Sequence, residues 1–297
     1  MKMKIKNQLM MAVALLMAVG CAEDETPKTA EDNAVEGLPV TISTTITPLG
    51  GDTRTSTSGP LGTVFDDGDK INILEWTKDA QGTLLYRAQA VAEVDASSRW
   101  NYLAGSTEAE QLTWFGTRTT SHRFIALYPA IDGGIADPAN IPVTIDPTAE
   151  LSAQDYLVAA TDKTFADSPE GQVNFPFKHL MGKLTVETTS LITIQSISLK
   201  VKGVYGGKID LTRTDVNNNP AAIVEPTGAK ETKTWQTITN SGVINIDVAS
   251  VMIPQDKVEV ILTLTNDNGT EKSYTYVTSI EANRNKRLTI TPMNVND

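Results

Sequence analysis

Few side chains in this 297-residue sequence belong to the types that carry out covalent or metal chemistry. There is one cysteine, Cys21, and there are two histidines, His122 and His179. Two histidines are too few for a metal centre made of several imidazoles, and a single cysteine excludes an intrachain disulfide. His122 has no nucleophile elbow of the G-x-S-x-G type nearby, and His179 follows an apolar stretch that favours a core position. The 36 acidic residues show no spacing that singles out a catalytic pair. We therefore expect neither an enzyme nor a cofactor.

Acidic residues are densest at Asp66-Asp67-Gly68-Asp69. This density is typical of a calcium loop, but the spacing of an EF-hand and its distal glutamate are missing. A turn that leads into the next strand is favoured, with a cation site as the alternative.

The amino terminus has the pattern of a signal peptide over residues 1–20. Three lysines among the first six residues precede the apolar stretch 9–19, which ends in small residues. This stretch is about half of the ~20 residues that a membrane-spanning helix needs. Ala18-Val19-Gly20-Cys21 resembles the bacterial lipobox, with alanine where leucine is commoner. The chemistry expected at Cys21 is therefore lipidation, which would anchor the chain in a membrane.

Residues 21–37 are polar and acidic, which predicts a flexible tether. The run Ala22-Glu23-Asp24-Glu25 resembles the signal that sends Bacteroidota lipoproteins to the outer leaflet, with an ordinary solvated linker as the alternative. Residues 1–20 hold three lysines and no acid, so their removal changes the formal net charge from −11 to −14. Such an acidic chain argues against nucleic acid or anionic lipid as a partner.

The next chemically informative residue is Arg54. A predicted strand over residues 40–47, with Val40, Ile42, Thr44 and Ile46 on one face, precedes a loop rich in Gly, Ser and Thr that holds Arg54. An exposed arginine in a flexible loop is a site for a trypsin-like protease, and cleavage would make Thr55 the new amino terminus. The strand would then lose its covalent tie, and its departure would open an apolar groove beside an unpaired sheet edge. The alternative is that Arg54 is simply a loop charge.

The elements that position these residues are predicted to be short strands. Apolar residues alternate along many β-branched segments, and no stretch keeps a helical period beyond about ten residues. Further predicted strands are 71–76, 84–92, 141–145, 155–160, 173–177, 183–189, 194–202, 243–248, 258–265, 271–278 and 287–291. Gly206-Gly207 and Asp132-Gly133-Gly134 predict turns, and Asp267-Asn268-Gly269 predicts a hairpin with a type I′ turn. Antiparallel strands over this length predict two β-sandwiches.

Several motifs in a fixed order resemble those of the fimbrillin family, which comprises pilins and related surface lipoproteins of Bacteroidota. The similarity is collinear over residues 40–291 and follows the lipoprotein signal. The motifs are Thr53-Arg54-Thr55, Phe65-Asp66-Asp67-Gly68-Asp69-Lys70-Ile71, Ala126-Leu127-Tyr128-Pro129, Asp155-Tyr156-Leu157, residues 173–184 and Ile253-Pro254-Gln255.

The resemblance implies an all-β fold of two tandem transthyretin-like β-sandwich domains, here 38–178 and 179–297. It also implies a precursor lipidated at Cys21 and cut by an arginine-specific protease at the position of Arg54 and Thr55. The strand at 40–47 matches the one that is displaced, and subunits then polymerise by strand exchange. The implied partners are other pilus subunits, and the implied locations are the outer membrane and, after processing, the fimbrium.

The carboxyl end and the tryptophans refine this hypothesis. Pro292 closes the last predicted strand, and residues 293–297 are too few for an extra donor strand. Either the segment 287–291 is itself exchanged, or the subunit accepts a strand without donating one. The second case favours an accessory or tip subunit that binds a host or bacterial surface ligand. One rival is a surface glycan-binding lipoprotein that does not polymerise, with sugars stacked on the tryptophans. A surface hydrolase is the weaker rival. The tryptophans in question are Trp76, Trp100, Trp114 and Trp235.

Overall fold

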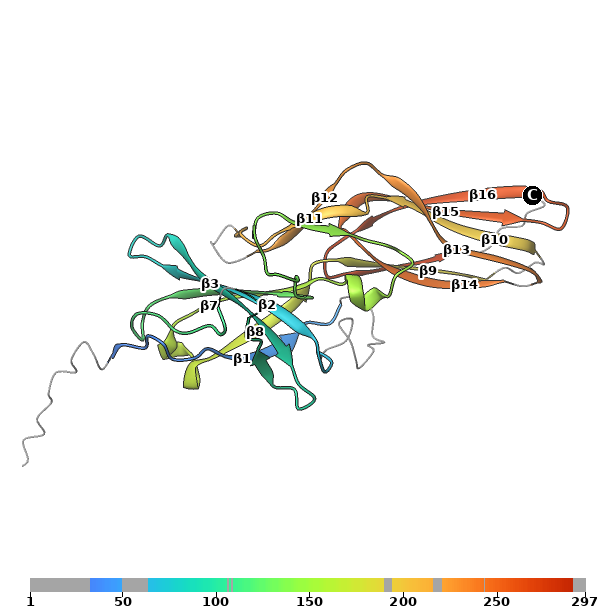
Figure 1. The fold of residues 1–297 in the computed structure, drawn as a ribbon. Helices are drawn as coiled ribbons and strands as arrows, with labels where there is room; N and C mark the ends of the chain where they lie inside the picture. Colours follow the sequence, from blue (N-terminus) through green and yellow to red (C-terminus); the bar gives the residue numbers. More distant parts are fainter. Residues whose placement is uncertain are drawn as a thin grey trace, which may run out of the picture. The chain divides into compact units, whose positions relative to one another are not determined.

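The structure is a computed structural model that describes residues 33–49, 64–105, 107, 109–189, 194–215, 221–242 and 244–290. Its described part is all-β, as expected, with short 3-10 turns at Leu151–Gln154, Phe165–Asp167 and Pro169–Gly171 (Figure 1). None of these turns approaches the length and hydropathy of a membrane-spanning helix.

The first group of strands forms a seven-stranded sheet in the order β1-β8-β7-β5-β2-β3-β4. Its inner face contributes Val173, Phe175 and Phe177 to a core cluster that also contains Trp114 and Phe124. Strand β8 alternates strictly between exposed and buried residues, which is the pattern that predicts a half-buried strand. The strands are β1 (Thr41–Ile46), β2 (Lys70–Lys78), β3 (Leu84–Val94), β4 (Trp100–Tyr102), β5 (His122–Tyr128), β7 (Leu157–Lys163) and β8 (Gln172–His179).

The remaining strands form a four-stranded sheet, β13-β10-β15-β16, and two three-stranded sheets, β14-β9-β17 and β12-β11-β6. Side chains of the four-stranded sheet and of β14-β9-β17 enter one core cluster, which is the arrangement of a β-sandwich. The bounds are β6 (Ile141–Thr144), β9 (Gly182–Thr189), β10 (Ile194–Gly203), β11 (Gly206–Asp210), β12 (Ile223–Thr227), β13 (Glu231–Gly242), β14 (Asn245–Met252), β15 (Gln255–Thr265), β16 (Glu271–Ile280) and β17 (Asn285–Ile290).

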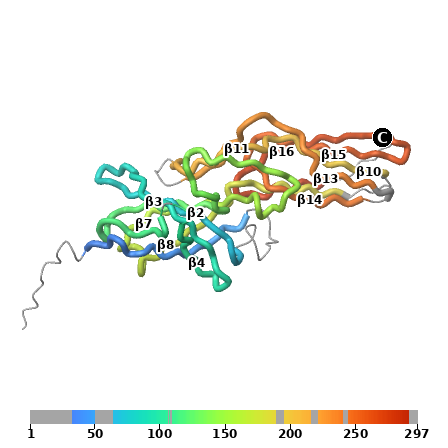
Figure 2. Tube along the Cα trace, in the orientation of Figure 1, coloured from blue at the N-terminus to red at the C-terminus, as the bar shows by residue number. Residues whose placement is uncertain are grey.

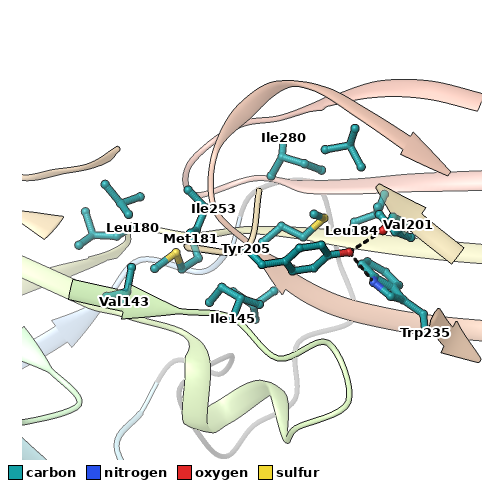
Figure 3. Packing of buried hydrophobic residues seen from close by; sticks show 14 of the residues in the cluster. Val143, Ile145, Leu180, Met181, Leu184, Val201, Tyr205, Trp235, Ile253 and Ile280 are labelled. Carbon is teal, nitrogen blue, oxygen red and sulfur yellow. Dashed lines mark hydrogen bonds between the residues drawn. The ribbon is translucent and has the colours of Figure 1, made fainter. Parts of the chain in front are cut away.

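The polar atoms of two aromatic residues, Tyr205 and Trp235, are hydrogen-bonded inside this second core (Figure 3). The Tyr205 hydroxyl donates to the Val201 carbonyl at 2.8 Å, and the Trp235 indole N–H donates to the Tyr205 oxygen at 3.1 Å. Burial raises the pKa of Tyr205 to about 12, so this hydroxyl remains a donor at neutral pH. The chain thus buries two large rings without leaving their polar atoms unpaired.

Strand β6 connects parts of the chain that the sequence analysis placed in different domains. It pairs antiparallel with β11, with Ile141 opposite Ile209. Ile141, Val143 and Ile145 are buried in the second core, although they precede the expected boundary at 178/179. The sequence pattern gives the strand but not its partner, because strand pairing depends on long-range contacts.

Several local expectations need correction. The pairs β1–β8 and β9–β17 are parallel, whereas antiparallel strands were expected throughout. In each pair the partners are not joined by a hairpin, so no tight turn imposes an antiparallel direction.

Gly206-Gly207 was expected to be a turn but begins β11, where a Cβ on Gly207 would lie 2.8 Å from the Glu225 carbonyl oxygen.

The hairpin at residues 266–270 is present, but its turn type differs from the expected type I′. The Gly269 N–H donates to the Asn266 carbonyl at 2.9 Å, and Gly269 has a φ of 77°. Asn268 does not have a positive φ, which a type I′ turn would require. A type I turn followed by one left-handed residue is the common three-residue hairpin loop, which fits these values.

Gly182, at the start of β9, offers a test of this packing. A Cβ there would meet the Ile280 side chain and lie 2.5 Å from the Glu281 carbonyl oxygen. We expect Gly182→Ala to lower the free energy of unfolding by about 1–3 kcal/mol in urea titrations. Gly206→Ala is the matched control, because its Cβ would have no neighbour nearer than 3.4 Å. Equal losses for the two variants would contradict the packing described.

Candidate functional site

The strand of interest, β1, lies at one edge of the seven-stranded sheet. Among the described residues it pairs with β8 alone, in parallel, with Thr41 opposite Gln172 and Ile46 opposite Phe177. In Figure 2 the blue tube of this segment runs beside β8. A single backbone ladder therefore connects β1 to the sheet.

Of the four residues expected on one face of this strand, Val40, Ile42 and Ile46 pack into or against the first core cluster. Val40 is 1% exposed and Ile46 is 8% exposed. Ile42 is half-buried and packs against the first core cluster. Thr44 is half-buried, and its hydroxyl accepts a hydrogen bond from the Trp100 indole at 3.2 Å. These side chains fill the groove that would open if β1 left.

The chain just before β1 is bound more firmly than its composition predicts. The N–H groups of Val35, Gly37 and Val40 donate to the carbonyls of Gly116, Trp114 and Leu112, each at 3.0 Å. Trp114 returns a bond from its own N–H to the Leu38 carbonyl at 2.8 Å. Val35 is buried in the first core cluster. The folded part thus extends into the range 21–37 that was expected to be a tether.

A hollow runs along the edge of β1 that faces away from β8. It has a volume of about 540 Å³, and its lining includes Phe65, Trp100, Tyr102 and the whole of 39–44. The Tyr102 hydroxyl donates to the Val40 carbonyl at 3.0 Å. Phe65 closes the inner wall, with its ring 5.2 Å from Trp100 and 5.1 Å from Phe177. On this side β1 itself accepts one side-chain hydrogen bond, at Thr44, and the preceding Val40 accepts another. The backbone bonds on this side are those of residues 35–40 to 112–116.

The two side-chain bonds to β1 give a testable prediction. Tyr102→Phe and Trp100→Phe each remove one donor, and each is expected to weaken the attachment of β1 by about 0.5–1.5 kcal/mol. Faster hydrogen exchange at the amides of residues 41–46 would report this change. Tyr276→Phe on β16 is the control for the same loss of a hydroxyl. Unchanged exchange in both variants would show that these bonds do not hold the strand.

Both histidines are buried, and each is hydrogen-bonded to a carboxylate. His122 Nδ1 lies 2.7 Å from Glu75 Oε1, and His179 Nδ1 lies 2.6 Å from Asp155 Oδ2. Burial raises the pKa of Asp155, and the hydrogen bond with His179 opposes that shift. The core position expected for His179 is confirmed by its 2% exposure. Sequence reasoning missed the two carboxylate partners, because Glu75 and Asp155 are distant along the chain.

The acidic run at Asp66–Asp69 forms a turn. Asp69 accepts hydrogen bonds from the Asp66 N–H at 2.8 Å and from the Tyr128 hydroxyl at 3.0 Å. Burial raises the pKa of Asp69, although both hydrogen bonds act in the opposite direction. Nowhere in the described residues do three His, Cys, Asp or Glu side chains gather as a metal site requires.

The four tryptophans do not form one platform. Trp114 lies in the first core and Trp235 in the second, and both are buried. Trp100 borders the hollow beside β1. Trp76 contacts Tyr86 edge to face at 5.8 Å on the rim of a different hollow of about 460 Å³.

Three residues of the hypothesis, Cys21, Arg54 and Thr55, lie outside the described residues, as do residues 291–297. The described residues form an all-β fold with a β-sandwich core, and their edge strand β1 precedes Arg54 in the sequence.

Comparison with known proteins identifies the family. The family model described as fimbrillin-like matches residues 53–296, so this chain belongs to the fimbrillin-like family. No curated protein sequence is significantly similar to it.

Solved structures share the fold. A putative cell adhesion protein from Bacteroides ovatus is 16% identical with a TM-score of 0.54, and the match covers 85% of this chain and 91% of that one. A putative cell adhesion protein from Bacteroides uniformis is 16% identical with a TM-score of 0.52, over 88% and 92% of the two chains. At these identities the likeness concerns the fold alone. Family membership supports a pilus- or adhesion-related subunit at the cell surface.

Proposed function

We propose that this chain is an accessory or tip pilus subunit that is exported as a lipoprotein on Cys21 and assembled by strand exchange after cleavage at Arg54. The observation that carries the proposal is the position of β1, an edge strand with one backbone ladder and with inward residues that fill an apolar site. Arg54 follows this strand by eight residues, so one cut would break the covalent link between β1 and the strands that follow it.

The energetics favour an exchange over a simple loss of β1. Full burial of a Val or Ile side chain contributes about 1.5–3 kcal/mol, and Val40 and Ile46 are both buried here. Departure of β1 would expose this apolar surface and the unpaired edge of β8. A donor strand with apolar residues at alternate positions would restore both contributions without a covalent bond.

The same cut would release the lipid. Everything from Cys21 to Arg54 would leave together, so the anchor would serve export and keep the groove filled until assembly. The precursor would comprise two tandem transthyretin-like domains, 38–178 and 179–297, and after the cut the first of them would begin at Thr55. The two core clusters support this division, apart from the pairing of β6 with β11.

A peptide experiment tests the exchange. The chain is cut with an arginine-specific protease, the released segment is removed in mild denaturant, and a peptide of residues 39–47 is added. We expect the peptide to bind the cut chain and not the uncut chain. A control peptide with Ile42→Asp and Ile46→Asp is expected to bind at least tenfold more weakly. Equal binding of the two peptides, or no binding to the cut chain, would overturn the proposal.

A second candidate, a surface glycan-binding protein, is supported by the aromatic rim of Trp76 and Tyr86, with Tyr86 46% exposed. Aromatic faces suit the apolar faces of sugar rings. This candidate predicts glycan binding by the uncut chain that Trp76→Ala removes and that no strand peptide affects.

A further inference from the structure

Strand β16 is an edge strand of unusual character. It is the last strand of the sheet β13-β10-β15-β16, and it pairs only with β15 among the described residues. It is ten residues long, and residues 273–280 contain neither a charge nor a proline. Val277 is 64% exposed. A long uncharged edge is a ready template for a strand from another chain.

The other edges of the described sheets each carry a feature that discourages pairing. Trp100 bonds Thr44 of β1 and Tyr102 bonds Val40 just before it, and β4 has three residues. Prolines lie in β6 and β12, charges lie in β14 and β17, and β13 has two register shifts against β10. Such devices are how natural sheets avoid edge-to-edge contact. Their lack along 273–280 singles out β16 as a docking edge.

The hairpin fixes which backbone groups of β16 are free. The Asn266 N–H donates to the Thr270 carbonyl at 3.0 Å, so hydrogen-bonded pairs with β15 recur at every second residue from there. The groups of residues 272, 274, 276 and 278 therefore point toward β15. The groups of residues 271, 273, 275, 277 and 279 point away from it, and the side chains of these five residues are all exposed.

We propose that β16 pairs antiparallel with β16 of a second copy, with Thr275 opposite its own counterpart. In this register Ser273 lies opposite Val277, and Glu271 lies opposite Ser279. On the other face Tyr274 lies opposite Tyr276, which is a favourable aromatic pair. Lys272 lies opposite Thr278, so no like charges meet. The edge is therefore complementary to itself, as a two-fold interface requires.

The paired edge would join two four-stranded sheets into one continuous sheet. Five free residues on each copy supply roughly ten backbone hydrogen bonds. One strand pair buries less than an interface of standard size, so the association is weak in dilute solution and is favoured where copies are concentrated. This contact uses a different edge and a different sheet from β1, so it does not depend on cleavage at Arg54.

Cysteine trapping tests the register directly. In a Cys21→Ala background an introduced cysteine is the sole thiol of the chain. Thr275→Cys would place the two Cα atoms roughly 5.5 Å apart, within the range for a disulfide. Ser279→Cys would place them roughly 26 Å apart, since eight residues separate the two positions along the strand. Thr239→Cys, at an exposed site on the opposite edge strand β13, is the matched control.

We expect mild oxidation of the purified full chain to give at least tenfold more covalent dimer for Thr275→Cys than for Ser279→Cys or Thr239→Cys. Adding Val277→Lys to Thr275→Cys should reduce the dimer toward the control level, with an unchanged circular dichroism spectrum. Equal yields at positions 275 and 239, or at 275 and 279, would overturn the proposal. Such equal yields are also what we expect if another segment of the chain, or a different partner, covers the β16 edge.

Discussion

Replacement of Arg54 by alanine is expected to abolish conversion of the precursor to the cut form by an arginine-specific protease. The cut chain should fall from nearly all of the protein to below a tenth under the same conditions, because the substitution removes the arginine that the protease is proposed to recognise. Intact mass measurement over a digestion time course gives the result.

Arg99→Ala is the control for this prediction. Arg99 is an exposed arginine in the turn between β3 and β4, where it forms an ion pair with Asp95 at 3.3 Å. The Arg99 variant is expected to be cut like the parent. Rapid cleavage of the Arg54 variant at another arginine, with release of the amino-terminal strand, would show that Arg54 is not the processing site.

The second large effect is expected in the first core. His122→Ala should lower the free energy of unfolding by about 3–5 kcal/mol, because it leaves Glu75 buried without its partner. His122 Nε2 also bonds the Phe115 carbonyl at 3.1 Å, and its ring lies 5.0 Å from Trp114. The variant therefore removes contacts on both sides of the ring. Urea titration monitored by tryptophan fluorescence measures the loss.

The double variant Glu75→Met with His122→Leu separates charge from packing. Replacement of both partners by apolar residues of similar volume is often nearly neutral, so this variant should be more stable than His122→Ala alone. If His122→Ala were within 1 kcal/mol of the parent, the buried pair would have no structural role. The Glu75–His122 pair also bears on the attachment of β1. The His122 ring contacts Trp114, and the backbone of residues 112–116 binds residues 35–40 just before β1.

The strands that the sequence predicts best are those buried on one face. In β8 and β15 exposed or half-buried residues alternate with buried ones, and both were predicted close to their observed bounds. Strand β5 was missed because all seven of its residues are buried, so it shows no alternation. Its Phe124 lies in the first core and its Ile125 in the second.

For β1, the sequence predicts which residues share a face but not which strands and side chains the strand contacts. Alternation placed Val40, Ile42, Thr44 and Ile46 on one face, since neighbouring residues of a strand point to opposite sides. The parallel pairing with β8 and the two bonds from β4 depend on residues more than 50 positions away. The binding of 35–40 to 112–116 is hidden for the same reason, because a polar, acidic composition does not reveal a distant backbone partner.

The most direct test of the central claim is the mass of the mature protein's amino-terminal peptide, taken from the surface of cells that produce it. The account predicts a chain that begins at Thr55, with β1 and the Cys21 lipid both removed. A surface protein that carries only a lipidated Cys21 terminus, with residues 40–54 still attached, would contradict it.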